Sequence, residues 1–191
     1  FAEMAKGVED VCFEQGFVAV LCDTDEQPSK AIGHLELLYQ QRAAGFVVVS
    51  PGHITPHLQQ LLDNGYRIVV VDRALSTLET DSVVSDNYGG GRQAVEHLLA
   101  LGHRRIGFVI SNLEHETIQG RWAGAKDAMR CAGVAIDPAL VYTDGDELPG
   151  SGYEGAEFIL RHNRPPTAIF AFNDLMALGV LRYAQKHHIE V

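Results

Sequence analysis

The amino-acid sequence predicts an α/β fold of two lobes, each a parallel β-sheet flanked by helices. The first reason is that short apolar runs alternate with longer segments carrying apolar residues at helical spacing. The second is that runs such as FVVVS and RIVVVD are continuously apolar, which is typical of parallel strands buried on both faces. The third is a polar link at 73–81, which interrupts the alternation and separates two groups of strands, about seven in all.

Proline and glycine mark the ends of the predicted helices in the first half of the chain. Pro28 opens one helix and Gly45 closes it, while Pro56 lies in the first turn of the next, where its missing N–H costs nothing. Gly16 ends the first helix. The expected order is helix 1–15, strand 17–22, helix 28–44, strand 46–50, helix 55–64 and strand 67–72.

The second half repeats the same unit. Asn87 begins a long helix that reaches Leu101 and Gly102, and three further strand–helix pairs follow it. The expected order is strand 82–85, helix 87–101, strand 105–111, helix 117–132, strand 141–144, helix 151–162, strand 167–172, helix 174–187 and a further strand beginning at Ile189.

Charge divides the chain in the same way and excludes one function. Residues 1–86 hold 13 Asp and Glu against 5 Lys and Arg, whereas residues 87–191 hold 12 against 10, so we expect an N-terminal lobe at 1–86 and a C-terminal lobe at 87–191. The formal net charge of −10 repels phosphate backbones. These residues are therefore not expected to bind DNA by themselves.

The cysteines and the apolar runs indicate the compartment. Cys12, Cys22 and Cys131 form an odd set without CxxC spacing, which fits a reducing cytoplasm, and we expect buried thiols that behave as small hydrophobic groups. No apolar run approaches the ~20 residues that a membrane helix needs. The sequence therefore predicts a cytoplasmic protein without membrane contact.

Polar side chains follow nearly every predicted strand. Ligands in open parallel sheets bind beyond the carboxyl ends of the strands, so these positions are the candidate site. The alternative is that each residue only caps the helix that follows. Where two polar residues stand together, the binding interpretation gains weight. The positions are Asp23, Ser50-Pro51, Asp72-Arg73, Ser85-Asp86, Ser111-Asn112, Asp144 and Asn173-Asp174.

Catalytic and metal signatures are missing from the sequence. There is no GxSxG elbow, no phosphate loop of the GxxxxGK[ST] type and no GxGxxG. The run 89–91 could cradle a phosphate, but we expect it to allow close helix–sheet packing. His53 and His57 have metal-pair spacing, yet Pro56 and a loop separate them. We therefore predict no enzyme, no cofactor and no metal.

Several motifs together resemble the LacI/GalR family of bacterial transcription regulators. They are the stretch DSVVSDNYGGGRQAVEHLLALGHRRIGFV, the helix start RWAG at 121–124 and the segment FNDLMALG at 172–179. Phe1-Ala2-Glu3, Asp23-Thr24-Asp25 and Val71-Asp72-Arg73 also fit. The resemblance covers the whole chain in order, and it is strongest toward purine and ribose repressors. It implies a two-lobed, periplasmic-binding-protein-like effector-binding domain.

The resemblance also implies a ligand site in the cleft between the lobes. Carried over residue by residue, it assigns Phe1 to stack on the ligand, Ser50 and Arg73 to the N-terminal side, and Thr117, Arg121, Asn173 and Asp174 to the C-terminal side. We further expect Asp174 to orient Arg121. Purine-binding relatives have an arginine where this chain has His115 and an aromatic residue where it has Glu147. These departures favour a sugar-like ligand, a monosaccharide, over a purine.

Partners and alternatives follow from the same resemblance. The family implies a homodimer, for which we expect helices 28–44 and 174–187 to supply apolar surface, and operator binding only through a helix-turn-helix absent from this chain. A first strand would precede Phe1, and a late strand would follow Val191. The alternative is a periplasmic sugar-binding protein of an ABC transporter, which shares the fold.

Overall fold

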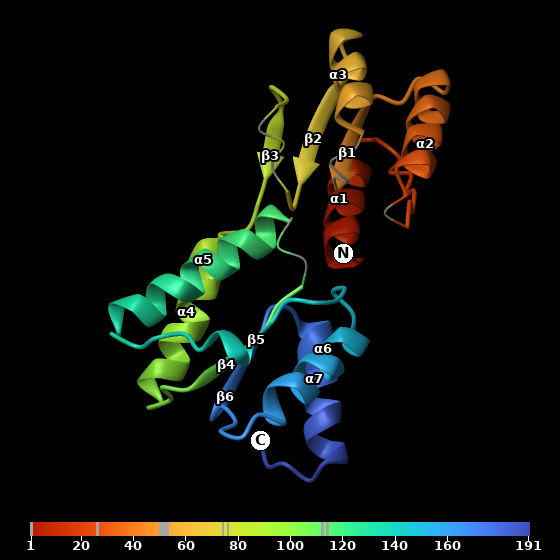
Figure 1. Cartoon of the computed structure of the whole chain (residues 1–191). Helices are drawn as coiled ribbons and strands as arrows, with labels where there is room; N and C mark the ends of the chain where they lie inside the picture. Colours follow the sequence, from red (N-terminus) through yellow and green to blue (C-terminus); the bar gives the residue numbers. More distant parts are fainter. Residues whose placement is uncertain are drawn as a thin grey trace. The chain divides into compact units, whose positions relative to one another are not determined.

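The computed structural model describes residues 2–25, 27–49, 54–73, 75, 77–111, 113 and 115–191. Phe1 and Ser50, both predicted to contact the ligand, lie outside the described residues, as does His53. The chain divides into two compact units, residues 1–84 and 85–191. Each unit holds a parallel sheet with helices against it, so the predicted α/β fold class is confirmed (Figure 1).

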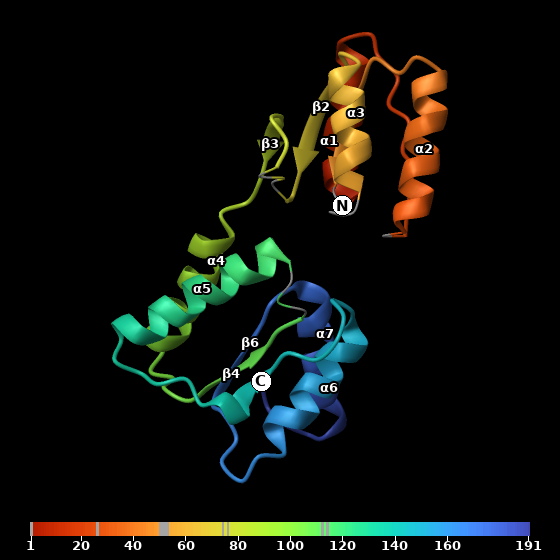
Figure 2. The same ribbon diagram turned by 45° about the horizontal axis from the view of Figure 1, so that its top comes forward.

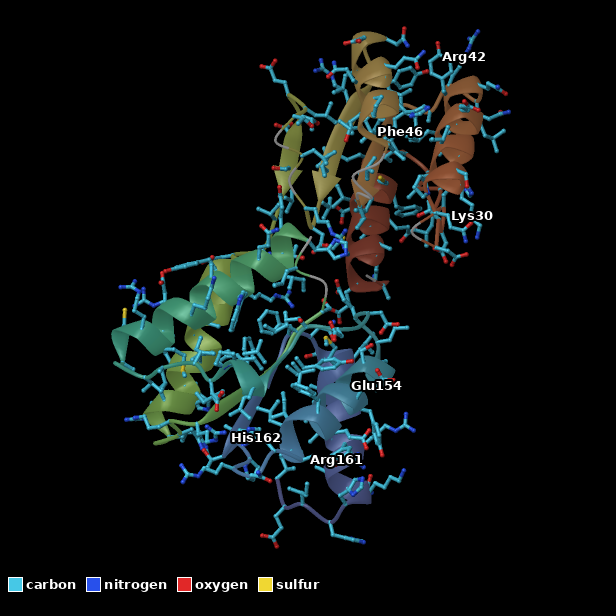
Figure 3. All side chains as sticks on the ribbon, viewed as in Figure 1. Lys30, Arg42, Phe46, Glu154, Arg161 and His162 are labelled. Atoms are coloured by element: carbon cyan, nitrogen blue, oxygen red, sulfur yellow. The ribbon has the colours of Figure 1, made fainter. Side chains whose placement is uncertain are left out.

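The first unit contains a three-stranded sheet in the order β1-β2-β3. Its core joins Leu35 of α2, Phe46 of β1 and Leu58 of α3 with Ile68 and Val70 of β2; Phe46 is labelled in Figure 3. The bounds are α1 Ala2–Glu14, α2 Pro28–Gln40, β1 Gly45–Val49, α3 Thr55–Asp63, β2 Arg67–Val71 and β3 Asp81–Val83.

One predicted strand of this unit does not form. Residues 17–22 have no regular secondary structure, and Val18 and Leu21 are 88% and 82% exposed. The prediction was wrong because a strand exists through its ladder of hydrogen bonds, and no described segment pairs with this run. Strand β1 is also less buried than the sequence predicted. Val47 is 49% exposed, so this strand is not buried on both faces.

The second unit contains a sheet in the order β5-β4-β6 with helices on both faces. All four residues of the central strand β4 are buried, as its continuously apolar sequence predicts. The bounds are α4 Asn87–Ala100, β4 Ile106–Val109, α5 Glu116–Cys131, a 3-10 turn Pro138–Leu140, β5 Val141–Tyr142, α6 Pro149–Leu160, β6 Ala168–Ala171 and α7 Asp174–Lys186. No strand forms at 189–191, so the expectation of one at Ile189 was wrong.

Side chains alternate across β4 and build two cores. Phe108 faces α4 and α5, where it packs with Val95, Ile118 and Met129. Val109 belongs to a second cluster, which contains Leu140, Ile159 and Met176 and so involves α6 and α7. Figures 1 and 2 both show α4 beside α5 on one side of the sheet and α6 beside α7 on the other.

Glycines set how closely these helices approach. An added Cβ at Gly91 would lie 2.1 Å from the carbonyl oxygen of Arg121, and one at Gly124 would lie 2.0 Å from that of Tyr88. The α4–α5 contact therefore has room for hydrogen atoms only. Glycine at 91 serves helix–helix packing, whereas the sequence suggested helix–sheet packing.

The cysteines differ from expectation. All three are free, Cys12 and Cys22 are half-buried, and Cys131 is exposed at the end of α5. The prediction of buried thiols fails because α1 buries none of its residues and Cys22 lies in the unpaired run 17–22. Within the described ranges, no helix has the length and apolar character needed to cross a membrane.

Candidate functional site at the carboxyl edge of the second sheet

The strands of the second unit end together at one edge. The Ile110 N–H donates to the Tyr142 carbonyl (2.8 Å), and the Phe172 N–H donates to the Val109 carbonyl (3.1 Å), so the ladder continues slightly beyond the strands. These bonds bring the segments that follow β4, β5 and β6 to the same edge. This is the position at which parallel sheets bind ligands.

Arg121 is fixed at this edge by two hydrogen bonds. Its Nε donates to Asn87 Oδ1 (2.9 Å), and its Nη1 donates to the carbonyl oxygen of Phe172. The expectation that Asp174 orients Arg121 is wrong, since neither bond involves it. The reason is the close α4–α5 contact, which places the Arg121 backbone against α4 and makes Asn87 the nearby acceptor. The only feature that pointed to Asn87 in the sequence analysis was its position at the start of a helix.

Asn173 bonds to the chain through both ends of its amide. Its Oδ1 accepts from the Met176 N–H (2.7 Å) and caps α7, and its Nδ2 donates to the Glu147 carbonyl (3.2 Å). The structure thus shows the capping role that the sequence left open, and it brings Asn173 and Glu147 together. Asp174 is exposed in the first turn of α7.

The segment after β5 folds tightly onto α6. The buried Ser151 hydroxyl donates to Asp146 Oδ1 (2.6 Å), and the same carboxylate oxygen accepts from the Leu148 N–H (3.0 Å). The Ser151 hydroxyl first, and the Leu148 N–H second, lower the pKa of Asp146. The segment borders an open surface depression of about 470 Å³, whose described lining residues are Leu113, Thr143, Asp144 and Gly145.

The lowered pKa of Asp146 predicts how stability depends on pH. The ionised carboxylate stabilises the fold above the unfolded pKa of about 3.9, and this contribution disappears as the pH falls through the lower folded value. Ser151→Ala removes the main cause of the shift. We therefore expect the variant to melt below the parent at pH 7, with the gap closing toward pH 2.5. A gap in Tm that is the same at both pH values would contradict this assignment.

The start of α5 holds the two other predicted residues of this unit. His115 precedes the helix without capping it, and Thr117 is half-buried in the first turn. Gln119 fixes the preceding loop by donating from Nε2 to the Leu113 carbonyl (2.7 Å). Ser111, one of the polar residues predicted at the strand ends, is 1% exposed, and its hydroxyl has no hydrogen-bond partner among the described residues.

In the first unit, Arg73 follows β2 as expected. Its Nε lies 3.9 Å from Asp72 Oδ2, and both side chains are partly buried. Asp72 takes a φ of 73°, and its N–H donates to the Val83 carbonyl (2.9 Å). The described residues contain no group of three His, Cys, Asp or Glu that could hold a metal ion.

A comparison with known protein families identifies the family to which this chain belongs. A family model for periplasmic binding proteins and the sugar-binding domain of the LacI family matches residues 1–190. The chain therefore belongs to this family, and the relatives below ally it with the LacI-type regulators.

Two curated relatives carry the name HTH-type transcriptional repressor PurR. The protein from Actinobacillus pleuropneumoniae serotype 5b is 32% identical over 181 residues, and that from Haemophilus influenzae strain PittEE is 34% identical over 181 residues. In each case the match covers 95% of this chain and 54% of the relative. The chain thus spans about half the length of these repressors.

Solved structures agree on the fold. A protein described as a ribose operon repressor from Burkholderia thailandensis has a TM-score of 0.88 at 26% identity, covering 100% of this chain and 70% of that one. The Cra regulator from Pseudomonas putida, in complex with fructose 1-phosphate, has a TM-score of 0.85 at 22% identity, covering 97% and 68%. The second likeness concerns the fold alone.

Proposed function

We propose that the chain is the effector-binding and dimerisation domain of a LacI/GalR-type transcription regulator, which senses a sugar-like ligand at the carboxyl edge of its second sheet. The fixed guanidinium of Arg121 is the observation that carries the proposal. Two of its N–H groups are held by Asn87 and Phe172, and the others remain to bind ligand oxygens. Because these two bonds already hold the guanidinium in place, ligand binding does not require a further loss of conformational entropy of this side chain.

The polar groups at this edge support a monosaccharide as the ligand. Each sugar hydroxyl both donates and accepts, so a sugar site needs donors and acceptors together. Arg121 supplies donors, and Thr143 and Asp144, which line the surface depression after β5, supply acceptors. Glu147 at the same edge is a further acceptor. A nucleobase is the second candidate, because the sequence motifs also resemble those of purine repressors.

DNA binding is assigned to a part of the protein outside residues 1–191. The net charge of −10 opposes contact with phosphate backbones, so ligand binding acts on DNA contacts made elsewhere. A transcription regulator works in the cytoplasm, and we propose that location. The transporter alternative has less support, because the curated relatives are repressors.

A ligand screen tests the proposal. A ligand present at 100 times its Kd stabilises the folded state by about 2.7 kcal/mol, which raises the melting temperature by several degrees. We expect at least one monosaccharide to produce this shift and isothermal calorimetry to give one site per chain. Stabilisation by hypoxanthine or guanine and by no sugar would select the nucleobase alternative. A complete lack of response to both classes would refute the proposed function.

The exposed face of α7 supports a homodimer. Leu175, Leu178 and Leu181 are exposed at a spacing of three residues and form one apolar stripe. Burying such a stripe against a second copy removes it from water. We expect the double variant Leu178→Glu and Leu181→Glu to weaken dimerisation at least tenfold in analytical ultracentrifugation. Leu101→Glu, at an equally exposed leucine after α4, is the matched control and should leave the dimer intact.

A further inference from the structure

A tight turn follows the point at which the chain leaves the first unit. The boundary between the two units lies between Val84 and Ser85. The Asn87 N–H donates to the Ser85 carbonyl (2.8 Å), and Asp86 between them has a φ of −71° and a ψ of 77°. This bond and these torsion angles define an inverse γ-turn. We call residues 85–87 the connector turn.

The side chain of Asn87 reinforces the connector turn and also binds Arg121. Its Nδ2 donates to the same Ser85 carbonyl (3.2 Å), and its Oδ1 accepts from Arg121 Nε (2.9 Å). An arginine Nε can only donate and a carbonyl oxygen can only accept, so the amide has one possible orientation. The opposite orientation would place two donors together at Arg121 and two acceptors together at Ser85. One side chain therefore holds the turn and the guanidinium at once.

The contact between α4 and α5 fixes the spacing of Asn87 and Arg121. A Cβ added at Gly120 would lie 3.1 Å from the Asn87 Cβ, so α5 passes this residue with little space to spare. The close approach at Gly91, described above, holds the same two helices together, and Asn87 is half-buried between them and solvent. A shift of the guanidinium must therefore be followed by the Asn87 amide, or the bond between them must break.

The two bonds of Asn87 make the turn and the guanidinium depend on each other. The connector turn holds the Asn87 amide in place through Ser85, and the amide oxygen in turn holds Arg121 Nε. A ligand that binds the fixed guanidinium therefore also stabilises the formed turn. By linkage, the formed turn raises the affinity for that ligand by the same factor.

We propose that Asn87 is a positioning residue that couples the ligand-binding guanidinium of Arg121 to the connector turn at the boundary of the two units. The inference rests on the proposed function, because it takes Arg121 to be the anchor of the ligand. It adds the route by which ligand binding reaches the segment that joins the units. This route runs along the covalent chain and needs no contact between the units.

Hydrogen exchange measured by NMR on residues 1–191 tests the coupling without a ligand. The reporter is the Asn87 N–H, which is bonded to Ser85 only in the formed turn, and the reference is the Ile110 N–H, which donates to the Tyr142 carbonyl in the sheet. Arg121→Met keeps an unbranched side chain but removes its donors. We expect it to speed exchange of the reporter, relative to the reference, about two- to tenfold, the usual net effect of one hydrogen bond. In an Asn87→Ala background the same substitution should have no further effect on the reporter, because the link is already broken.

Asn87→Asp separates the two bonds of the side chain. An aspartate still accepts from Arg121 Nε, but it cannot donate to the Ser85 carbonyl. The Arg121 Nε–H should therefore exchange slowly in Asn87→Asp and fast in Asn87→Ala, whereas the reporter should exchange fast in both variants. Gln93→Ala removes an exposed amide side chain from the same helix and is the matched control, which should leave both signals unchanged.

Sugar binding tests the coupling in the other direction. The probes are D-ribose and D-glucose, and a probe that binds should slow the reporter at least about twofold in the parent and not in Asn87→Ala. A reporter that ignores Arg121→Met, that responds to it equally in the Asn87→Ala background, or that ignores a bound sugar would overturn the inference and leave the proposed function standing. If neither sugar binds, the exchange rates of the Arg121→Met and Asn87→Ala variants still decide the inference, and the ligand screen decides the proposed function.

Discussion

Gly91→Ala is expected to destabilise the second unit by about 3 kcal/mol, the upper end of the usual cost of overpacking. The added Cβ would lie 2.1 Å from the Arg121 carbonyl oxygen and 2.6 Å from its Cα. Backbone atoms cannot rotate away as a side chain can, so α4 and α5 must separate. Separation exposes part of the core around Phe108 and moves Arg121 from the carboxyl edge. Urea denaturation followed by circular dichroism measures the loss.

The neighbouring residue provides the matched control. A Cβ at Gly90 would meet nothing within 4 Å, and the residue is exposed on α4. Gly90→Ala should therefore stabilise the unit by roughly 0.5–1 kcal/mol through the better helix propensity of alanine. Equal effects of the two substitutions would show that the close α4–α5 contact does not exist.

Arg121→Ala is expected to weaken binding of the proposed sugar effector by roughly 10- to 150-fold. Loss of a hydrogen bond from a charged group costs about 1.5–3 kcal/mol, which corresponds to that range. Arg121→Lys should lose nearly as much, because an ammonium cannot bond to Asn87, to the Phe172 carbonyl and to a ligand in the fixed geometry of a guanidinium. Calorimetry at a temperature well below the melting point of each variant measures the affinity.

Two observations separate a binding role from a structural one. Lys126 lies on the same helix, exposed and 5.6 Å from the centroid of the Trp122 ring, so Lys126→Ala should keep the parent affinity. Arg121→Ala should also lower the melting temperature, since its two bonds connect α5 to α4 and to the segment after β6. A folded Arg121→Ala variant with an affinity within about twofold of the parent would place the ligand site elsewhere.

The sequence predicted the second unit better than the first. The run RIGFVIS predicts a buried strand, and the structure buries β4 on both faces because β5 and β6 pair with it and helices cover it. The equally apolar run at 17–22 has no strand beside it among the residues that the structure describes, and its own sequence pattern contains no information about such a partner. Local composition therefore identified the apolar segments, whereas pairing decided which of them became strands.

The candidate site, too, could be predicted only in part from the sequence. The position of polar residues after the strands follows from the alternation of elements, so Asn173 could be placed at this edge in advance, whereas Arg121 and Glu147 were assigned by the resemblance to the LacI/GalR family. Their bonds could not, because they depend on distances between helices. The glycine contact at Gly91 made Asn87 the partner of Arg121 in place of Asp174. Asn173 was identified as a polar residue at a strand end, but its capping role required the geometry of α7.

The unpaired run FVAVLC at 17–22 has a consequence for the solubility of the protein. It contains no charge and no proline, its residues favour β-structure, and four of its apolar side chains are largely exposed. Segments of six or seven residues with these properties are the ones that stack into intermolecular cross-β assemblies when nothing covers them. The backbone N–H and C=O groups that find no ladder within the described part of the chain are free to form one with another molecule. For residues 1–191 taken by themselves, these six residues are therefore expected to promote aggregation at high protein concentration.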